Sequence, residues 1–236
     1  MIAAVLRAVL FDFNGVLVDD EPIHFELLAR VLGEEGVELP RERYYDRFLG
    51  LDDRASFGTA LREAGQPVSE ARTARLVARK ASYYRDRIRR DGYPFFTGAV
   101  ELVRRLAEAG LPLGVVSGAL REEVEGALAQ AGIDRLFKVL VTAEDTREGK
   151  PDPEGYRAAV EALNTEPPLP DRMIHPHEVL AVEDSSAGLA AAAGAGLSTL
   201  AVAHTYAADT LSDADLVVER IGAVAAEALL AKFAEG

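Results

Sequence analysis

Four polar segments of this sequence contain side chains that could perform chemistry, and each of them follows a short apolar run. Asp12, Ser117 and Lys150 stand in three of the segments, and Glu183 and Asp184 stand together in the fourth. They offer carboxylates, a hydroxyl and an ammonium group. Phosphoryl transfer requires a nucleophile, a metal to neutralise phosphate charge, and hydrogen-bonding or cationic groups around the transferring oxygens. This set of residues therefore suffices for a phosphoryl-transfer site.

A magnesium ion fits the same set of residues. Mg²⁺ prefers hard oxygen ligands and usually keeps several waters, so Asp12, Asp184 and a nearby backbone carbonyl could hold it. Lys150 could then balance the charge of the nucleophile carboxylate and of the phosphate. The chain has no cysteine, which excludes a disulfide framework, a thiolate zinc site and a cysteine nucleophile. Mg²⁺ is therefore the expected cofactor.

The elements that position these residues are short apolar strands alternating with helices. Apolar runs predict strands over 8–11, 113–116, 139–141, 179–182 and 199–202. Helical patterns cover 99–109, 121–131, 153–163 and 186–195. Continuous hydrophobicity indicates strands buried on both faces, and the alternation predicts an α/β fold with a doubly wound, mostly parallel sheet. In such sheets ligands bind outside the carboxyl ends of the strands, where the polar residues above are expected.

One region breaks the alternation. Between residues 22 and 90 the pattern shows no buried strand and only amphipathic helical segments, at 25–32, 55–64 and 70–89. We therefore expect a Rossmann-like core formed by residues 1–20 and 92–236. A helical cap domain formed by residues 21–91 is expected to be inserted after the first strand.

Composition restricts the class of protein. A chain of 236 residues with 49% hydrophobic content can form a core domain with a smaller one attached. The net charge of −13 argues against a protein that neutralises nucleic-acid phosphates or docks on anionic lipid. Residues 187–204, the Gly- and Ala-rich part of the longest uncharged stretch, are slightly fewer than the roughly 20 apolar residues that span a bilayer. We expect a cytoplasmic enzyme without nucleic-acid or membrane partners, and the oligomeric state stays open.

The motifs resemble those of the haloacid dehalogenase superfamily, specifically its phosphatase and β-phosphoglucomutase-like branch with a helical cap. The resemblance covers essentially the full length. The first family motif is Asp-x-Asp-Gly-x-x-x-Asp, the second a Ser or Thr after the second strand, the third a Lys and the fourth an acidic pair. The matching residues are Asp12, Gly15 and Asp19, then Ser117, then Lys150, then Glu183 and Asp184. Four motifs in the right order are far more specific than any one of them.

The resemblance implies a role for each matching residue. Asp12 would attack phosphorus and form an aspartyl phosphate. Asp12, Asp184 and the backbone carbonyl of Asn14 would coordinate Mg²⁺. For Glu183, metal ligation and a supporting structural role are both open. Ser117, the Gly118 amide and Lys150 would bind the phosphate of a small phosphorylated metabolite, although Ser117 could equally cap the following helix.

Position 14 departs from the family pattern. Phosphatases and phosphomutases of the family carry an Asp there, which protonates the leaving oxygen and later deprotonates the attacking water or hydroxyl. The amide of Asn14 can do neither, and such acid–base help is typically worth ~10²–10⁴ in rate. The backbone carbonyl is unaffected. We therefore expect a defect in turnover and not in binding of magnesium or phosphate.

Several explanations for Asn14 remain open. The leaving group could need no protonation, or the protein could bind its ligand without turning it over. A substitute acid could come from Glu21 or His24, and His24 stands where β-phosphoglucomutase-like members carry a cap-loop His. The Asn14-Gly15 pair is also prone to deamidation, which would restore an Asp.

Three functions follow from these expectations. The leading one is magnesium-dependent hydrolysis of a small phosphomonoester through an aspartyl phosphate. The alternatives are a β-phosphoglucomutase-like sugar-phosphate mutase and a catalytically impaired protein that binds a phosphorylated ligand. In the cap, Arg54 resembles a substrate-specificity residue, although it could simply belong to a solvated helix start.

Overall fold

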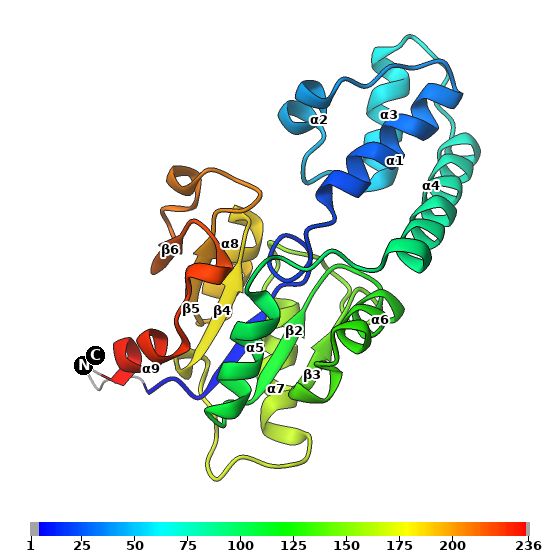
Figure 1. Cartoon of the computed structure of the whole chain (residues 1–236). Helices are drawn as coiled ribbons and strands as arrows, with labels where there is room; N and C mark the ends of the chain where they lie inside the picture. Colours follow the sequence, from blue (N-terminus) through cyan, green and yellow to red (C-terminus); the bar gives the residue numbers. More distant parts are fainter. Residues whose placement is uncertain (1–4, 235–236) are drawn as a thin grey trace. The chain divides into compact units, whose positions relative to one another are not determined.

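The computed structural model describes residues 5–234. The chain forms two compact units, one comprising the chain through Asp19 together with the chain from Tyr93 onward, and the other comprising Asp20–Gly92 (Figure 1). The first unit contains the sheet, and the second contains helices α1 to α4. Residues 1–4 and 235–236, which the sequence assigns to the core, lie outside the described residues.

A six-stranded parallel sheet forms the centre of the first unit, with the strands in the order β3-β2-β1-β4-β5-β6. The strands are β1 (Ala8–Phe11), β2 (Leu113–Val116), β3 (Phe137–Val141), β4 (Val179–Glu183), β5 (Ser198–Val202) and β6 (Leu216–Val218). Every residue of β1, β2 and β4 is buried, as continuous apolar runs predict. The expected doubly wound α/β fold is confirmed. The sequence pattern missed β6, a short edge strand whose side chains are partly exposed.

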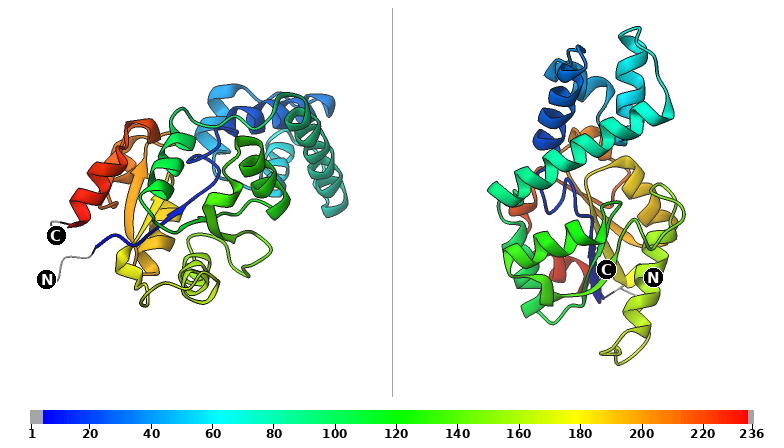
Figure 2. Two further views of the ribbon diagram at one scale, coloured as in Figure 1. Left: turned by 60° about the horizontal axis from the view of Figure 1, so that its bottom comes forward. Right: turned by 90° about the vertical axis from the view of Figure 1, so that its right-hand side faces the viewer.

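Helices cover both faces of the sheet (Figure 2). Successive side chains of a strand point to opposite faces. Val9 and Phe11 accordingly pack in one apolar cluster with α5 (Ala99–Glu108), α6 (Arg121–Ala131) and α9 (Ala226–Ala234). Ala8 and Leu10 pack in a second cluster with α7 (Glu154–Thr165) and α8 (Ser186–Gly194). Short 3₁₀ helices occupy Asp134–Leu136, Pro176–Glu178, Ala208–Leu211 and Ile221–Ala223.

The second unit is a small helical domain with its own core. Its helices are α1 (Glu21–Glu34), α2 (Arg41–Arg47), α3 (Asp53–Glu63) and α4 (Glu70–Asp91). Leu32, Phe48, Phe57, Leu61 and Leu76 are buried together. The sequence RERYYDR of α2 buries only Tyr44, so it has no apolar periodicity from which this helix could be predicted. None of the helices in the described part of the chain is long and apolar enough to cross a membrane.

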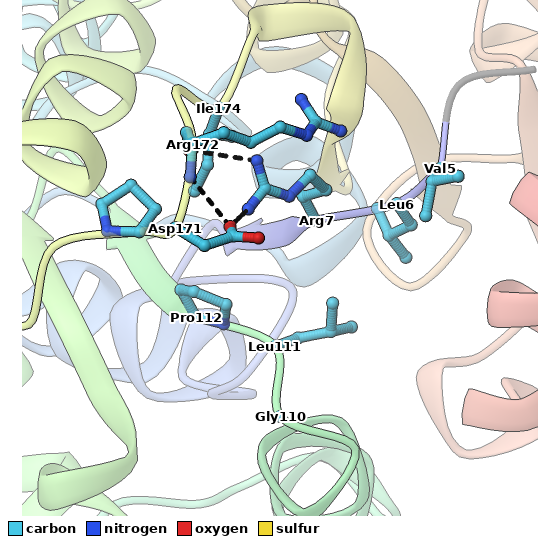
Figure 3. A pocket seen from close by; sticks show the side chains of 10 residues that line it. Val5, Leu6, Arg7, Gly110, Leu111, Pro112, Asp171, Arg172 and Ile174 are labelled. Carbon is cyan, nitrogen blue, oxygen red and sulfur yellow. Dashed lines mark hydrogen bonds and ion pairs between the residues drawn. The ribbon is translucent and has the colours of Figure 1, made fainter.

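A surface pocket of about 500 Å³ lies beside the segments that lead into β1 and β2 (Figure 3). The Arg7 guanidinium forms an ion pair with Asp171 there and donates hydrogen bonds to the carbonyls of Arg172 and Met173, at 3.1 and 3.2 Å. The pocket lies at the amino-terminal ends of these strands. It is therefore distinct from the predicted site, whose residues follow the strands. The lining residues are Val5, Leu6, Arg7, Gly110, Leu111, Pro112, Pro170, Asp171, Arg172 and Ile174.

Candidate active site

The predicted catalytic residues of the core meet at the carboxyl ends of neighbouring strands. Asp12 follows β1 directly, Ser117 follows β2, Glu183 ends β4 and Asp184 comes next. β1 lies between β2 and β4 in the sheet, so the connection after β1 runs to β2 on one side and the connection after β4 runs to β5 on the other. Such a switch in strand order opens a crevice in which α/β proteins bind ligands. The position of this cluster follows from the topology.

Lys150 connects two of the carboxylates. Its Nζ lies 2.8 Å from Asp12 Oδ1 and 2.7 Å from Glu183 Oε1. The Phe13 N–H also donates to Asp12 Oδ1, at 2.7 Å, so the Asp12 carboxylate is held from two directions. The buried Tyr156 hydroxyl, on α7, donates to Glu183 Oε1 at 2.5 Å. Asp12, Lys150 and Glu183 thus form one buried network of ion pairs.

Asp12, Glu183 and Asp184 together have the composition of a cation site. One carboxylate oxygen of each lies within 4.8 Å of the others. Burial raises the pKa of Glu183 to about 8 and that of Asp184 to about 7, and the charge of Asp12 acts in the same direction on both. Glu183 Oε2 is buried and has no hydrogen-bond partner among the described residues. These all-oxygen donors, whose charged forms disfavour one another, fit a hard divalent cation that would relieve their repulsion.

The charge of Lys150 is stabilised by the same carboxylates. Burial alone would lower the pKa of an ammonium group, but the charges of Asp12 and Glu183 more than offset this and raise the pKa of Lys150 above its ordinary value. Lys150 therefore remains charged and can accompany either the free carboxylate of Asp12 or a bound phosphate.

Two glycines leave space for the carboxylates. A Cβ added to Gly188, on α8, would lie 1.9 Å from Glu183 Oε2. A Cβ added to Gly15 would lie 1.9 Å from Asp184 Oδ2, and Gly15 also has a positive φ of 75°. Both carboxylates thus rest against glycine backbone. The sequence motif pointed to Gly15, whereas Gly188 was missed because helical glycines are common and carry no distinct signal.

Ser117 and Gly118 lie in the turn between β2 and α6. The Ser117 hydroxyl accepts a hydrogen bond from the Ala119 N–H at 3.0 Å, which is the local turn-stabilising role expected of a Ser before a helix. A Cβ on Gly118 would meet no atom within 4 Å, so there is open space beside this residue. A phosphate-binding role for the two residues stays a prediction.

His24 belongs to a hydrogen-bonded network inside the helical unit. Its Nδ1 lies 2.9 Å from Lys80 Nζ, and its Nε2 lies 3.2 Å from Asp20 Oδ2. The ring stacks on Tyr84, whose hydroxyl also donates to Asp20. The buried Lys80 forms an ion pair with Asp53. Both ring nitrogens of His24 are therefore engaged within this unit.

Glu21 and Arg54 also lie in the helical unit. The Tyr44 hydroxyl donates to Glu21 Oε1 at 2.5 Å. Arg54 Nη1 lies 3.3 Å from Glu70 Oε1, and both side chains are exposed, as the solvated-helix interpretation of Arg54 expects. A role for His24, Glu21 or Arg54 at the carboxylate cluster stays a prediction.

Two residues after β5 contact Gly15 and Asp184 and were missed by the sequence reasoning. The Thr205 hydroxyl donates to Asp184 Oδ2, and His204 Nδ1 lies 2.9 Å from the carbonyl oxygen of Gly15. The sequence pattern did predict β5, and polar residues following a strand in a parallel sheet point to the same edge as the other site residues. That signal could have identified His204 and Thr205.

Comparison with known proteins decides the family. A model of the haloacid dehalogenase-like hydrolases matches residues 6–196. The chain belongs to the haloacid dehalogenase-like hydrolase family. It is 33% identical over 224 residues to validoxylamine A 7′-phosphate phosphatase of Streptomyces hygroscopicus subsp. limoneus, covering 90% of this chain and 93% of the relative. It is also 28% identical over 222 residues to a phosphorylated carbohydrates phosphatase of Thermotoga maritima, covering 93% of each.

The fold of this haloacid dehalogenase-like hydrolase also matches solved structures. β-Phosphoglucomutase from Clostridium difficile superposes with a TM-score of 0.77 over 98% of each chain, at 22% identity. At that identity the match concerns the fold. The predictions of family and enzyme class are thus confirmed, and the named relatives support phosphatase or phosphotransferase activity for the chain.

Proposed function

We propose that this hydrolase is a magnesium-dependent phosphatase that cleaves a small phosphomonoester through an aspartyl phosphate on Asp12. The observation that carries the proposal is the contact of Asp12 Oδ1 with Lys150 Nζ, at 2.8 Å, within the cluster that includes Glu183 and Asp184. A carboxylate held by an ammonium group beside a cation site can approach a phosphate dianion, which a lone carboxylate would repel.

In this proposal the chain's own residues hold the phosphate and the nucleophile in position. Asp12, Asp184 and the Asn14 carbonyl would hold Mg²⁺, with Glu183 either joining them or anchoring Lys150. When bound, Mg²⁺ supplies positive charge to the phosphoryl oxygens. Lys150, Ser117 and the Gly118 amide would contact the remaining oxygens, where preorganised donors stabilise the developing charge.

The reaction then has two steps. A carboxylate oxygen of Asp12 forms a bond to phosphorus while the bond from phosphorus to the leaving oxygen breaks, and the electron pair departs with the leaving group. Water next attacks phosphorus, the bond to Asp12 breaks, a proton passes to solvent, and inorganic phosphate is released. Lys150 accompanies the regenerated carboxylate of Asp12 through its ion pair.

Asn14 limits the substrates that this site can process. Its amide is neither an acid nor a base near neutral pH, and the substitute acids considered above have partners within the helical unit, His24 in Asp20 and Lys80, and Glu21 in Tyr44. Deamidation is disfavoured as well, because the Gly15 N–H that would close the succinimide donates to the Val18 carbonyl at 2.9 Å. These contacts support a leaving group that departs with little protonation.

The relatives suggest the class of substrate. Two of them are named for hydrolysing validoxylamine A 7′-phosphate and phosphorylated carbohydrates. We infer that this chain acts on a phosphorylated, carbohydrate-like metabolite, with the cytoplasm as its expected location. A mutase would need proton transfer to and from sugar hydroxyls, which Asn14 does not favour.

The test is phosphate release from a panel of sugar phosphates and p-nitrophenyl phosphate, by wild type and Asp12→Asn, with Mg²⁺ and after chelation. We expect release that requires Mg²⁺ and falls by at least ~10³ in Asp12→Asn, because the nucleophile is removed. A wild type without Mg²⁺-dependent release would contradict the proposal and favour a ligand-binding protein. A burst of phosphate without any isomerised sugar phosphate would exclude the mutase.

A further inference from the structure

The hydrogen bonds of His204 define its tautomer. The Ile221 backbone N–H points at His204 Nε2 over 3.0 Å, and a backbone N–H can only donate, so Nε2 is the acceptor. Nδ1 therefore carries the ring proton and donates it to the Gly15 carbonyl oxygen, 2.9 Å away. The ring stacks on Phe96 with 3.8 Å between centroids. Burial lowers the pKa of His204, which is consistent with a neutral ring.

The hydrogen bond from His204 to the Gly15 carbonyl fixes the second of two consecutive peptide groups in the turn that follows Asp12. The Gly15 N–H donates to the Val18 carbonyl at 2.9 Å and fixes the peptide group between Asn14 and Gly15. His204 fixes the next group, between Gly15 and Val16, through its carbonyl. Because a trans peptide group is planar, the direction of the Gly15 N–H also sets the opposite direction of the Asn14 carbonyl.

Thr205, the residue after His204, also lies beside this turn. The Thr205 hydroxyl donates to Asp184 Oδ2, and the position of a Cβ on Gly15 would lie 2.9 Å from Thr205 Oγ1. His204 thus contacts the Asn14–Gly15 turn, and Thr205 contacts the carboxylate of Asp184. Gly15 has a positive φ of 75°, and glycine populates positive and negative φ about equally, so contacts from outside help to select this conformation of the turn.

We propose that His204 is a positioning residue that holds the Asn14–Gly15 turn in the geometry needed for phosphoryl transfer. That the Nδ1–H donor of His204 holds the turn does not depend on the proposed function. Its consequence for turnover rests on the proposed function.

Three substitutions separate the contacts of His204. His204→Phe keeps a ring for stacking on Phe96 but removes both hydrogen bonds. His204→Asn can place an amide N–H near the position of Nδ1 and so keeps the donor to Gly15, whereas His204→Gln reaches toward the position of Nε2 and keeps the acceptor for Ile221. His177→Phe, the same change at an exposed histidine, is the matched control.

Hydrogen exchange of the peptide covering residues 12–18 reports on the turn without any substrate or metal. We expect faster exchange in His204→Phe and His204→Gln, and exchange close to wild type in His204→Asn and His177→Phe. In the turnover assay we expect kcat to fall at least about tenfold in His204→Phe and His204→Gln with little change in KM, since small misplacements of reacting groups lower rates steeply. His204→Asn should recover most of the rate.

Each outcome decides the proposal. Unchanged exchange and unchanged kcat in His204→Phe would overturn it, and so would rescue by His204→Gln instead of His204→Asn, because His204 would then only anchor Ile221. If His204→Phe does not fold, the comparison of His204→Asn with His204→Gln still decides. If the wild type releases no phosphate, the proposed function fails and the exchange data alone decide whether His204 holds the turn.

Discussion

The side-chain amide of Asn14 lies in a turn whose backbone is held by hydrogen bonds to both the N–H and the carbonyl of Gly15. The Gly15 N–H is bound by the Val18 carbonyl, and the Gly15 carbonyl is bound by His204. A change of the Asn14 side chain therefore alters the chemistry of the site more than its backbone. The carbonyl expected to contact the metal is preserved whichever of Asn or Asp is present.

Asn14→Asp tests the missing acid. We expect kcat for alkyl phosphates to rise by ~10²–10⁴, because a carboxyl group can protonate the leaving oxygen. The gain for p-nitrophenyl phosphate should be smaller, since its leaving group is stable as an anion. The measurement is kcat for both substrates, with Asn14→Asp in an Asp12→Asn background as the inactive control. An unchanged or lower rate for alkyl phosphates would show that another residue already supplies the proton.

At the scale of elements, α8 begins at Ser186, shortly after the carboxylates of Glu183 and Asp184 at the end of β4. The Ser185 side chain caps this helix by accepting from the Gly188 N–H at 3.1 Å, and Gly188 leaves the space that Glu183 fills. The segment from Glu183 to Gly188 therefore combines a strand end, a helix cap and the glycine against which Glu183 packs. Gly188 is required by the packing of Glu183.

Gly188→Ala tests this packing. An added methyl group in contact with Glu183 should destabilise the core unit by about 1–3 kcal/mol, as overpacking usually does. Gly126→Ala, on α6, is the matched control, because the nearest atom to its Cβ would be Tyr93 Oη at an ordinary 3.4 Å. There we expect a slight stabilisation, by about 0.5–1 kcal/mol, from better helix propensity. Chemical denaturation measures both, and equal effects would contradict the role assigned to Gly188.

The sequence predicted the elements that are strongly apolar and the residues that stand at their ends. Five strands were expected where β1 to β5 lie, and Asp12, Lys150 and Glu183 do come together. β6 was missed because an edge strand is only partly buried, and α2 because it buries a single side chain. Tyr156 was missed because its contact with Glu183 joins segments distant in sequence, whereas His204 and Thr205 could have been found from their position just after β5.

At the scale of the whole molecule, acidic groups dominate, with a net charge of −13, and individual carboxylates differ in their response to acid. Glu178, just before β4, accepts from the His175 N–H at 2.9 Å and from Arg172 at 2.6 and 3.1 Å. The hydrogen bonds from Arg172, with the one from the His175 N–H, lower the pKa of Glu178 to about 2 from its ordinary 4.5, although burial acts in the opposite direction. This carboxylate therefore stabilises the folded core in its charged form.

Glu178→Gln should reveal that contribution through its pH dependence. Because the pKa of Glu178 is lower in the folded state than in the unfolded state, its carboxylate stabilises the folded protein fully at pH values above the unfolded pKa of about 4.5. This stabilisation is lost as the pH falls through about 2. We expect the difference in unfolding free energy between wild type and Glu178→Gln to be largest near pH 6 and to shrink toward pH 2. Denaturation at a series of pH values measures it, with Glu161→Gln at an exposed position as control. A difference independent of pH would contradict the assignment.

The position of β1 in the middle of the sheet has a consequence for biosynthesis. Phe11 pairs with Val115 on one side and with Val182 on the other, so β1 is synthesised before both of its neighbours and receives the second of them only after β2 and β3 have been synthesised. The helical unit, whose segment is continuous, is fully synthesised long before that neighbour appears. Such late, long-range pairing slows folding and leaves an open strand edge meanwhile. Nascent chains that stop before β4 therefore lack the carboxylates that complete the site.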